Sequence, residues 1–309
     1  MEWADLVSGV LAAAIPMAVP LLLVGLGEMF DQRAGMFNLG AEGIMMMGAF
    51  VAFFIDLKLQ TPWLGLLAAL LVGAAFGLLM GLVCVTFRSP QGIAGIGIYM
   101  LGWGLSGTLF RVYVGGPTPI QGIASLNLSS LRGVPYVGSV LAVLNPMDYA
   151  AFFLIPLSGW LLFKTAWGLK ARAVGTTPRA ADTLGIGVSR VRYQCVVLGG
   201  AMAGLAGAYL SVCQAKMFAD NITAGRGFIA VALVYFGRWS PWGVAVGAAI
   251  FSLAVAAQRL IQFYGAKFPY ELALVIPYVL VIVVLACSRN RDKSEPTALG
   301  KPYYREYRG

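Results

Sequence analysis

Long apolar stretches alternate with short charged joints along this chain of 309 residues. A helix needs about 20 apolar residues to cross the hydrocarbon core of a bilayer, and several stretches reach that length. The pattern therefore predicts an all-α, polytopic membrane protein with one transmembrane domain over 1–288. The apolar runs and their breaks predict about nine crossings (eight to ten), at 5–27, 39–56, 63–87, 92–113, 148–166, 193–214, 226–237, 241–262 and 271–288.

Positive charges are distributed unevenly between the two sides of this predicted helical bundle. With the N-terminus outside and the C-terminus in the cytoplasm, 15 of the 22 Lys and Arg residues lie inside and 7 outside, as the positive-inside rule requires. This bias and contact with anionic lipids account for the net charge of +9, so we expect no nucleic-acid partner. Segment 114–147 is then an outer loop, 167–192 a cytoplasmic loop and 289–309 a flexible cytoplasmic tail.

Composition narrows the possible chemistry. Charged residues make up 11% of the chain, against about 25% in soluble domains. The absence of histidine excludes a Ser-His-Asp triad and every His-ligated metal site, and the four cysteines form no CxxC pair. The sequence contains no GxxxxGK[ST] phosphate loop. We therefore expect no catalytic residue, metal or cofactor in this chain, and the energy for active transport would come from another polypeptide.

Small residues recur at every fourth position in the third and sixth predicted crossings. Such spacing lets helix backbones approach closely, which membrane proteins use where no hydrophobic force drives helices together. The sequence therefore predicts packing seams in the bundle or in a dimer interface. The three rows are Gly73, Gly77 and Gly81, then Gly199, Ala203 and Gly207, and finally Gly200, Gly204 and Ala208.

The cytoplasmic loop after the fifth crossing contains a short helix with capping signals. Thr177 suits a helix N-cap, Pro178 the first helical position and Gly185 a left-handed C-terminal cap. A two-turn helix is marginal in water and gains stability by docking. The sequence favours a coupling helix for a cytoplasmic motor domain, with an ordinary cationic loop as the alternative. The predicted coupling residues are Gly175, Thr177, Pro178, Arg179, Ala180, Ala181, Asp182, Leu184 and Gly185.

Two polar interruptions precede the second and seventh predicted crossings. Irregular backbone inside a membrane is tolerated only where protein or a water-filled cavity covers it, and paired interruptions are typical of transport pathways. A half-helix beginning near Thr223 would direct its N-terminal amides at the middle of the membrane. Tight turns with structural glycines are the alternative, and Glu42 could instead pair with Arg33. The predicted pathway residues are Asn38, Glu42, Asn221, Thr223 and Arg226.

Four blocks in a fixed order resemble the permeases of ABC importers of the basic-membrane-protein type, which serve nucleosides and simple sugars. The blocks are DQRAGMFNLGAEGIMMMGA, GLKARAVGTTPRAADTLGIGVSRVRY, GGAMAGLAGAYL and NITAGRGFIAVALVYFGRWSPWG. The similarity extends from about Pro20 to Gln258 and is weaker to ribose-type and branched-chain amino-acid permeases. The segment FRSPQGIAGIGIYM at the start of the fourth crossing departs from the family. If this segment touches the substrate, the substrate specificity would differ from that of the nucleoside permeases.

The resemblance implies the translocation subunit of an importer in a bacterial plasma membrane. It implies that 175–187 meets a cytoplasmic ATPase subunit, which uses ATP and Mg²⁺ and carries two ATP-binding domains. It also implies a second, paralogous permease and an extracytoplasmic binding lipoprotein that delivers the substrate. The alternatives from the residues alone are a stand-alone carrier or channel for a small polar solute and, least supported, a membrane-embedded enzyme.

Overall fold

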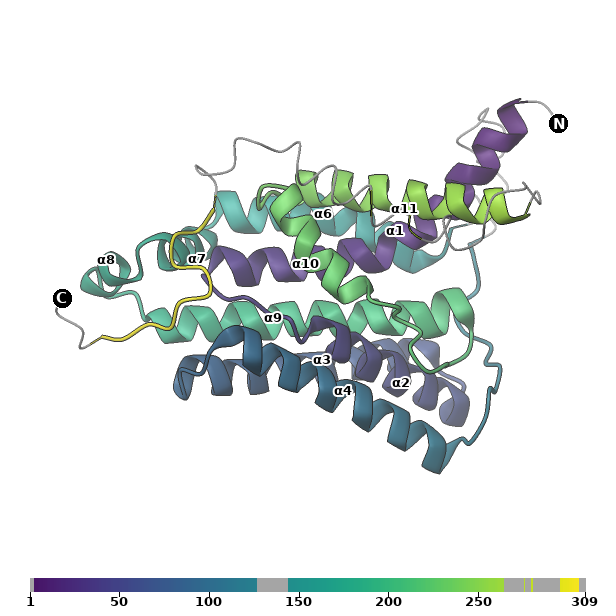
Figure 1. Ribbon diagram of the computed structural model, residues 1–309, viewed down its shortest axis with the longest axis horizontal. Helices are drawn as coiled ribbons and strands as arrows, with labels where there is room; N and C mark the ends of the chain where they lie inside the picture. The colour runs from purple at the N-terminus through teal and green to yellow at the C-terminus, as the bar shows by residue number, and fades with distance from the viewer. Residues whose placement is uncertain (1–2, 127–143, 264–274, 276–278, 280–294, 306–309) are drawn as a thin grey trace.

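A computed structural model of the chain describes residues 3–126, 144–263, 275, 279 and 295–305. Its α-helices run mostly along the long axis of the molecule (Figure 1). Short π-helical turns extend α3 over Leu82–Thr86 and α9 over Tyr209–Ala215. The helices are α1 (Trp3–Arg33), α2 (Ala41–Leu59), α3 (Pro62–Gly81), α4 (Gln91–Tyr113), α6 (Pro146–Lys164), α7 (Ala166–Thr176), α8 (Pro178–Thr183), α9 (Val188–Ala208), α10 (Arg226–Phe236) and α11 (Pro241–Phe263).

Six helices of the described part are long and apolar enough to cross a membrane, namely α1, α3, α4, α6, α9 and α11. This confirms a polytopic helical membrane protein. The predicted second crossing, α2, has 19 residues but carries Glu42, Asp56 and Lys58, and it is not among the six. The short seventh crossing is α10, with 11 residues. The predicted ninth crossing at 271–288 lies outside the described residues except at 275 and 279.

Several predicted boundaries move. Helix α1 continues to Arg33 instead of ending at 27, and a hydrogen bond within it, from Gln32 Nε2 to Glu28 Oε1 at 3.0 Å, satisfies two of its polar side chains. The segment 167–192, predicted as a cytoplasmic loop, is mostly helical and contains α8. The outer loop predicted for 114–147 ends where α6 begins, and its middle part, 127–143, lies outside the described residues.

Close backbone contacts hold α9 against its neighbours at the centre of the bundle. A Cβ atom added at Gly73 of α3 would clash with the Gly200 carbonyl oxygen of α9. One added at Gly207 would clash with the Met45 carbonyl oxygen of α2. Since these helices touch through their backbones, the small residues form packing seams within the subunit, as the sequence predicts.

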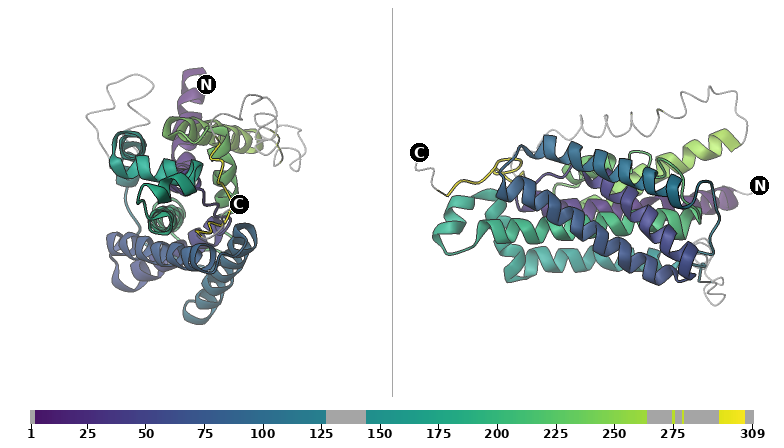
Figure 2. Two further views of the ribbon diagram at one scale, coloured as in Figure 1. Left: turned by 90° about the vertical axis from the view of Figure 1, so that its left-hand side faces the viewer. Right: turned by 90° about the horizontal axis from the view of Figure 1, so that it is seen from below.

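The N-terminus and the C-terminal segment lie at opposite ends of the bundle (Figures 1 and 2). Helices α7 and α8 gather at the same end as the C-terminal segment 295–305. This is the geometry that a chain with its termini on opposite sides of a membrane requires.

The C-terminal segment 295–305 corrects one prediction, because it is not a flexible tail. Ala298 N donates to Gly175 O at 3.0 Å, and Gly300 N donates to Gly35 O at 3.2 Å. Its mixed charges and prolines suggested disorder, but backbone hydrogen bonds to the end of α7 and to the turn after α1 hold it in place. The segment therefore belongs to the structured end of the bundle.

Candidate functional site

Helix α8 lies at the end of the bundle, at the position that the sequence predicts (Figure 1). Thr177 immediately precedes the helix and Pro178 is its first residue. Gly185, just beyond it, has a φ of +81°, a conformation that glycine adopts without strain. The Thr177 side chain makes no capping hydrogen bond. The predicted helix is thus confirmed, although its N-cap lacks the expected side-chain bond.

The structure divides the predicted coupling residues into an inner and an outer group. Inside, Ala181 is 2% exposed and packs with Ala171, Val174 and Val188. Gly175 is also buried, and a Cβ atom there would clash with the Arg33 carbonyl oxygen. These inner residues therefore fix α8 to α7 and α9.

The outer group of α8 is exposed in the single chain. Leu184 is 81% exposed, and Arg179 and Ala180 are exposed as well. Asp182 lies between the two groups and forms an ion pair with Arg305 at 3.1 Å. The exposed residues present an apolar side chain and a positive charge together, which is a surface that another protein can cover.

Glu42 joins the two polar interruptions of the sequence. Its Oε1 accepts hydrogen bonds from Thr223 Oγ1 at 2.5 Å and from Gly225 N at 2.7 Å, and its Oε2 accepts one from Gly227 N at 2.6 Å. Because α10 begins at Arg226, the carboxylate lies at the N-terminus of that helix, where the helix dipole favours a negative charge. We call these residues (Glu42, Thr223, Gly225 and Gly227) the α10 junction.

The α10 junction lies level with the middle of α4, a helix long and apolar enough to cross a membrane. Gly43, next to Glu42, packs against α4 so closely that a Cβ atom would lie 2.6 Å from Tyr99 Cα, and Gly102 contacts the Gly43 backbone from the same helix. With a rise of 1.5 Å per residue, Tyr99 and Gly102 lie about 12 and 16 Å along α4, a helix about 35 Å long. Glu42 is 2% exposed at this depth.

Arg226 lies beside the junction, whereas Asn221 is turned away from it. Arg226 Nη1 donates to Ile222 O at 3.1 Å and to Thr223 O at 3.0 Å. Asn221 is exposed and has a φ of +61°, so it occupies the turn that leads into α10. Of the second interruption, the structure therefore brings Thr223 and Arg226 to the predicted site and leaves Asn221 at its edge.

Asn38 has a local role in the first interruption. It is 1% exposed, its Oδ1 accepts a hydrogen bond from Gly40 N at 3.0 Å, and its N donates to Glu28 Oε1 at 3.2 Å. Asn38 shapes the turn that leads into α2, and no hydrogen bond between it and Glu42 occurs in the described structure.

The alternative of an ion pair between Glu42 and Arg33 is wrong. Arg33 Nε donates to Trp239 O at 3.0 Å, and Trp239 Nε1 donates to Gln32 Oε1 at 2.8 Å. These contacts tie the end of α1 to the turn between α10 and α11. Sequence reasoning missed Gln32 and Trp239; the only signal was a tryptophan directly before Ser-Pro at the end of a short crossing.

Comparison with known proteins identifies the chain. Residues 10–285 match the family described as the permease component of the branched-chain amino acid transport system. The chain belongs to this family. The permease is 34% identical to the guanosine ABC transporter permease NupQ of Bacillus subtilis, over 98% of each chain. No solved structure matches it.

Two further relatives carry permease names. The guanosine ABC transporter permease NupP, also from Bacillus subtilis, is 25% identical over 86% of this chain and 77% of the relative. The glucose ABC transporter permease TsgB13 of Haloferax volcanii is 25% identical over 87% of this chain and 72% of the relative. Together with the family match, these relatives confirm that the chain is the permease component of an ABC transporter and not an enzyme.

In the described part of the permease, no three His, Cys, Asp or Glu side chains lie close enough together to hold a metal ion.

Proposed function

We propose that the permease forms half of the translocation pathway of an ATP-driven importer for nucleosides or related simple sugars. A second, paralogous permease provides the other half, and a cytoplasmic ABC ATPase uses ATP and Mg²⁺ to drive the cycle. An extracytoplasmic binding lipoprotein delivers the substrate to a complex in the bacterial plasma membrane. Support for the pairing comes from NupQ and NupP, two guanosine permeases of one organism, and support for sugars from TsgB13.

The orientation that we propose has the N-terminus outside and α8 in the cytoplasm. Arg33, Arg179 and Arg192 belong to the end of the bundle that holds α8 and segment 295–305. The excess of positive charge predicted for the cytoplasmic side therefore coincides with the end that carries the coupling residues.

One observation carries the proposed coupling role: α8 is anchored on one face and exposed on the other. Ala181 is buried against α7 and α9, while Leu184 is 81% exposed. A two-turn helix with this division is suited to fill a groove in the ATPase and to transmit its movement. ATP binding would favour one arrangement of the ATPase, and α8 would pass that bias to the bundle as a shift between inward-facing and outward-facing states.

The proposed pathway passes the α10 junction, where polar groups reach the middle of the membrane. Three aromatic rings stand beside it. Phe228 directly follows Gly227 and contacts Tyr99 at 5.2 Å between ring centroids, and Tyr99 stacks on Trp103 at 6.1 Å. Trp103 is 48% exposed in the single chain. Aromatic faces stack on planar bases and on sugar rings, so we assign these three rings to the wall that the substrate meets.

The coupling role is tested by reversing charge and polarity on the outer face of α8. In the complete complex reconstituted in liposomes, we expect Arg179→Glu with Leu184→Glu to lower substrate-stimulated ATP hydrolysis and uptake at least about tenfold, since buried contacts of this kind contribute about 1–3 kcal/mol each. Lys216→Glu, an exposed charge reversal outside α8, serves as the control. Unchanged hydrolysis and uptake in the double variant would remove the support for coupling through α8.

The stand-alone carrier is tested with the permease alone. Liposomes that contain this chain without ATPase, second permease or lipoprotein should show no substrate flux above that of empty liposomes. Saturable flux in this preparation would favour a carrier or channel and contradict the proposed importer.

A further inference from the structure

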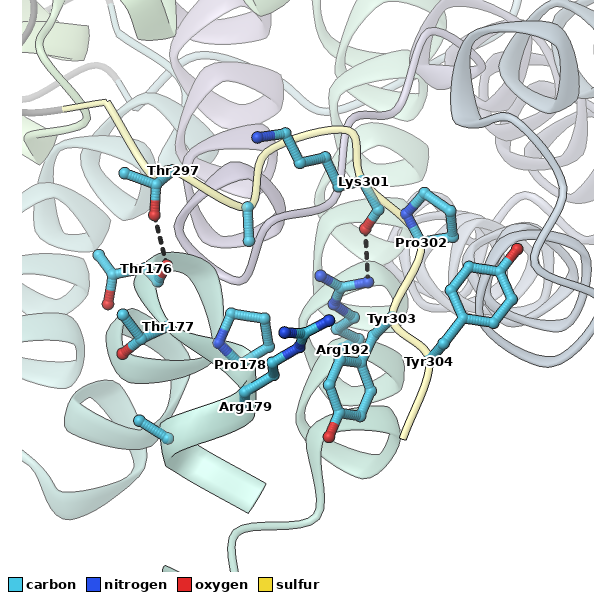
Figure 3. Close-up of a pocket in the computed structure, with 12 residues that line it drawn as sticks. Thr176, Thr177, Pro178, Arg179, Arg192, Thr297, Lys301, Pro302, Tyr303 and Tyr304 are labelled. Carbon is cyan, nitrogen blue, oxygen red and sulfur yellow. Dashed lines mark hydrogen bonds between the residues drawn. The ribbon is translucent and has the colours of Figure 1, made fainter. Parts of the chain in front are cut away.

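A cavity of about 920 Å³ opens between the corner of α7 and α8, the beginning of α9 and the C-terminal segment (Figure 3). We call it the C-terminal pocket. Its walls include Thr177 and Arg179 from the corner of α7 and α8, Arg192 from α9, and Lys301, Tyr303 and Tyr304 from the C-terminal segment. The volume lies in the range of pockets that enclose a small organic ligand, about 300–1000 Å³.

The C-terminal pocket is strongly cationic. Arg179, Arg192 and Lys301 contribute to its lining, and none of the described lining residues is Asp or Glu. Asp182 on α8 is already paired with Arg305 at 3.1 Å. Arg192 and Lys301 thus meet in a pocket whose described walls hold no carboxylate, which favours an anionic ligand.

Arg192 gives the strongest indication that a counter-ion is missing. Its side chain is 2% exposed, and Nη1 donates to Lys301 O at 3.0 Å. Its Nε and Nη2 have no hydrogen-bond partner among the described residues, and no carboxylate of the described part lies within ion-pair distance of it. A buried charge without a counter-charge is costly, so an anion that approaches this guanidinium would stabilise the site.

We infer that the C-terminal pocket binds a phosphate-bearing small molecule of the size of a nucleoside monophosphate. Arginine and lysine side chains recognise phosphate through charge-assisted hydrogen bonds, and the rings of Tyr303 and Tyr304 offer aromatic faces to the remainder of the molecule. The same phosphate chemistry is present in a lipid headgroup, so a soluble nucleotide and an anionic phospholipid are the two sources to compare.

Binding here would join the C-terminal segment to the root of α8. The ligand would contact Arg179 on α8 and Lys301 on the segment together, and so hold the coupling helix in one position. The binding itself does not depend on the proposed coupling role. Its effect on ATP hydrolysis does, so the two proposals can fail separately.

The test measures ligand binding to the purified permease–ATPase complex in phosphate-free buffer. By equilibrium dialysis with radiolabelled guanosine monophosphate, we expect saturable binding that excess inorganic phosphate displaces. Lys301→Gln should weaken this binding about tenfold or more, because a hydrogen bond to a charged group contributes about 1.5–3 kcal/mol. The backbone contact of residue 301 with Arg192 is kept in this variant.

Arg190→Gln is the matched control, since it removes an exposed arginine that lies two residues from Arg192 and does not line the pocket. This variant should bind as the unchanged protein does. Equal binding by the unchanged protein and Lys301→Gln would overturn the inference. So would the absence of saturable binding of phosphate and of guanosine monophosphate up to millimolar concentrations.

The source of the phosphate is decided in nanodiscs. If phosphatidylglycerol nanodiscs displace the nucleotide and phosphatidylcholine nanodiscs do not, the pocket takes a lipid headgroup; if neither does, it takes the soluble nucleotide. Both results support a phosphate site. A third outcome counts against it: Lys301→Gln weakens assembly with the ATPase although neither nucleotide nor anionic lipid binds, which would assign the pocket to an acidic segment of the ATPase.

Discussion

The α10 junction and the end of the bundle that carries α8 differ in how many of their groups have partners within the chain. At the junction, both oxygens of Glu42 are used, by the Thr223 hydroxyl and by two backbone amides within 2.7 Å. At the α8 end, Leu184 is 81% exposed, and two of the three guanidinium nitrogens of Arg192 lack a partner in the described structure. The Glu42 carboxylate thus has all its partners within the chain, whereas the α8 end has an exposed leucine and guanidinium nitrogens without partners in the described structure.

This difference indicates where other molecules are needed. Buried polar groups are normally paired, so the unused groups at the α8 end point to a ligand or a protein that completes them. The satisfied groups at the α10 junction indicate an internal connection between α2 and α10, which a transport cycle would have to loosen. The predictions below break or sharpen this contrast, in order of decreasing effect.

The largest effect is expected from Glu42→Ala, which removes the carboxylate at the centre of the α10 junction. The change leaves the Thr223 hydroxyl and the Gly225 and Gly227 amides without their acceptor, and each unsatisfied buried donor costs about 1–3 kcal/mol. We expect a marked fall in the thermal unfolding temperature and at least about a hundredfold loss of uptake in liposomes. Glu42→Gln keeps one acceptor oxygen, so its unfolding temperature and uptake should lie between those of the unchanged permease and of Glu42→Ala. Normal stability and uptake in Glu42→Ala would show that the α10 junction contributes to neither stability nor transport.

A smaller effect is expected from Trp103→Leu, which sharpens the assignment of the aromatic rings. Loss of a stacking face costs about 1–3 kcal/mol, so the substrate concentration for half-maximal uptake should rise about tenfold with an unchanged maximal rate. Trp160→Leu on α6 is the control, because Trp160 is 59% exposed and lies in none of these ring contacts. If both variants behave alike, the exposed tryptophans serve only lipid contact.

The smallest effect is expected from Arg305→Gln, which removes the ion pair at the α8 end. Arg305 is 78% exposed, and exposed ion pairs contribute about 0–1 kcal/mol. Burial and the nearby Asp182 raise the pKa of the Tyr303 hydroxyl, which therefore stays protonated and continues to hydrogen-bond Asp182. ATP hydrolysis by the complex should change less than about threefold, and less still at high salt. A loss as large as that of the α8 double variant would show that the segment itself drives coupling.

The sequence predicts local features of this permease well. The limits of α8 follow from Pro178 at its first position and Gly185 just beyond its end, since both signals depend on neighbours in the chain. The same holds for the short α10 after the second interruption. The glycine seams were also predictable, because a spacing of four residues places small side chains on one helical face.

Contacts between distant segments were not predictable. Arg33 lies near Glu42 in the sequence. The hydrogen-bond partners of Glu42, however, lie more than 180 residues away, at the start of α10. The docking of segment 295–305 depends on backbone groups of Gly35 and Gly175, which carry no side-chain signal. Helix α1 passes its expected end, and Gln32 and Glu28 satisfy each other within it, a pairing that hydropathy does not detect.

The glycine seam between α3 and α9 has a mechanical consequence. With no side chain between Gly73 and Gly200, the two helices touch through their backbones, and we expect them to move together. We therefore expect α9 to carry a movement of α8 along the bundle. The bending has to occur elsewhere, and the left-handed Gly225 before α10, with a φ of +79°, is the hinge that we expect to yield.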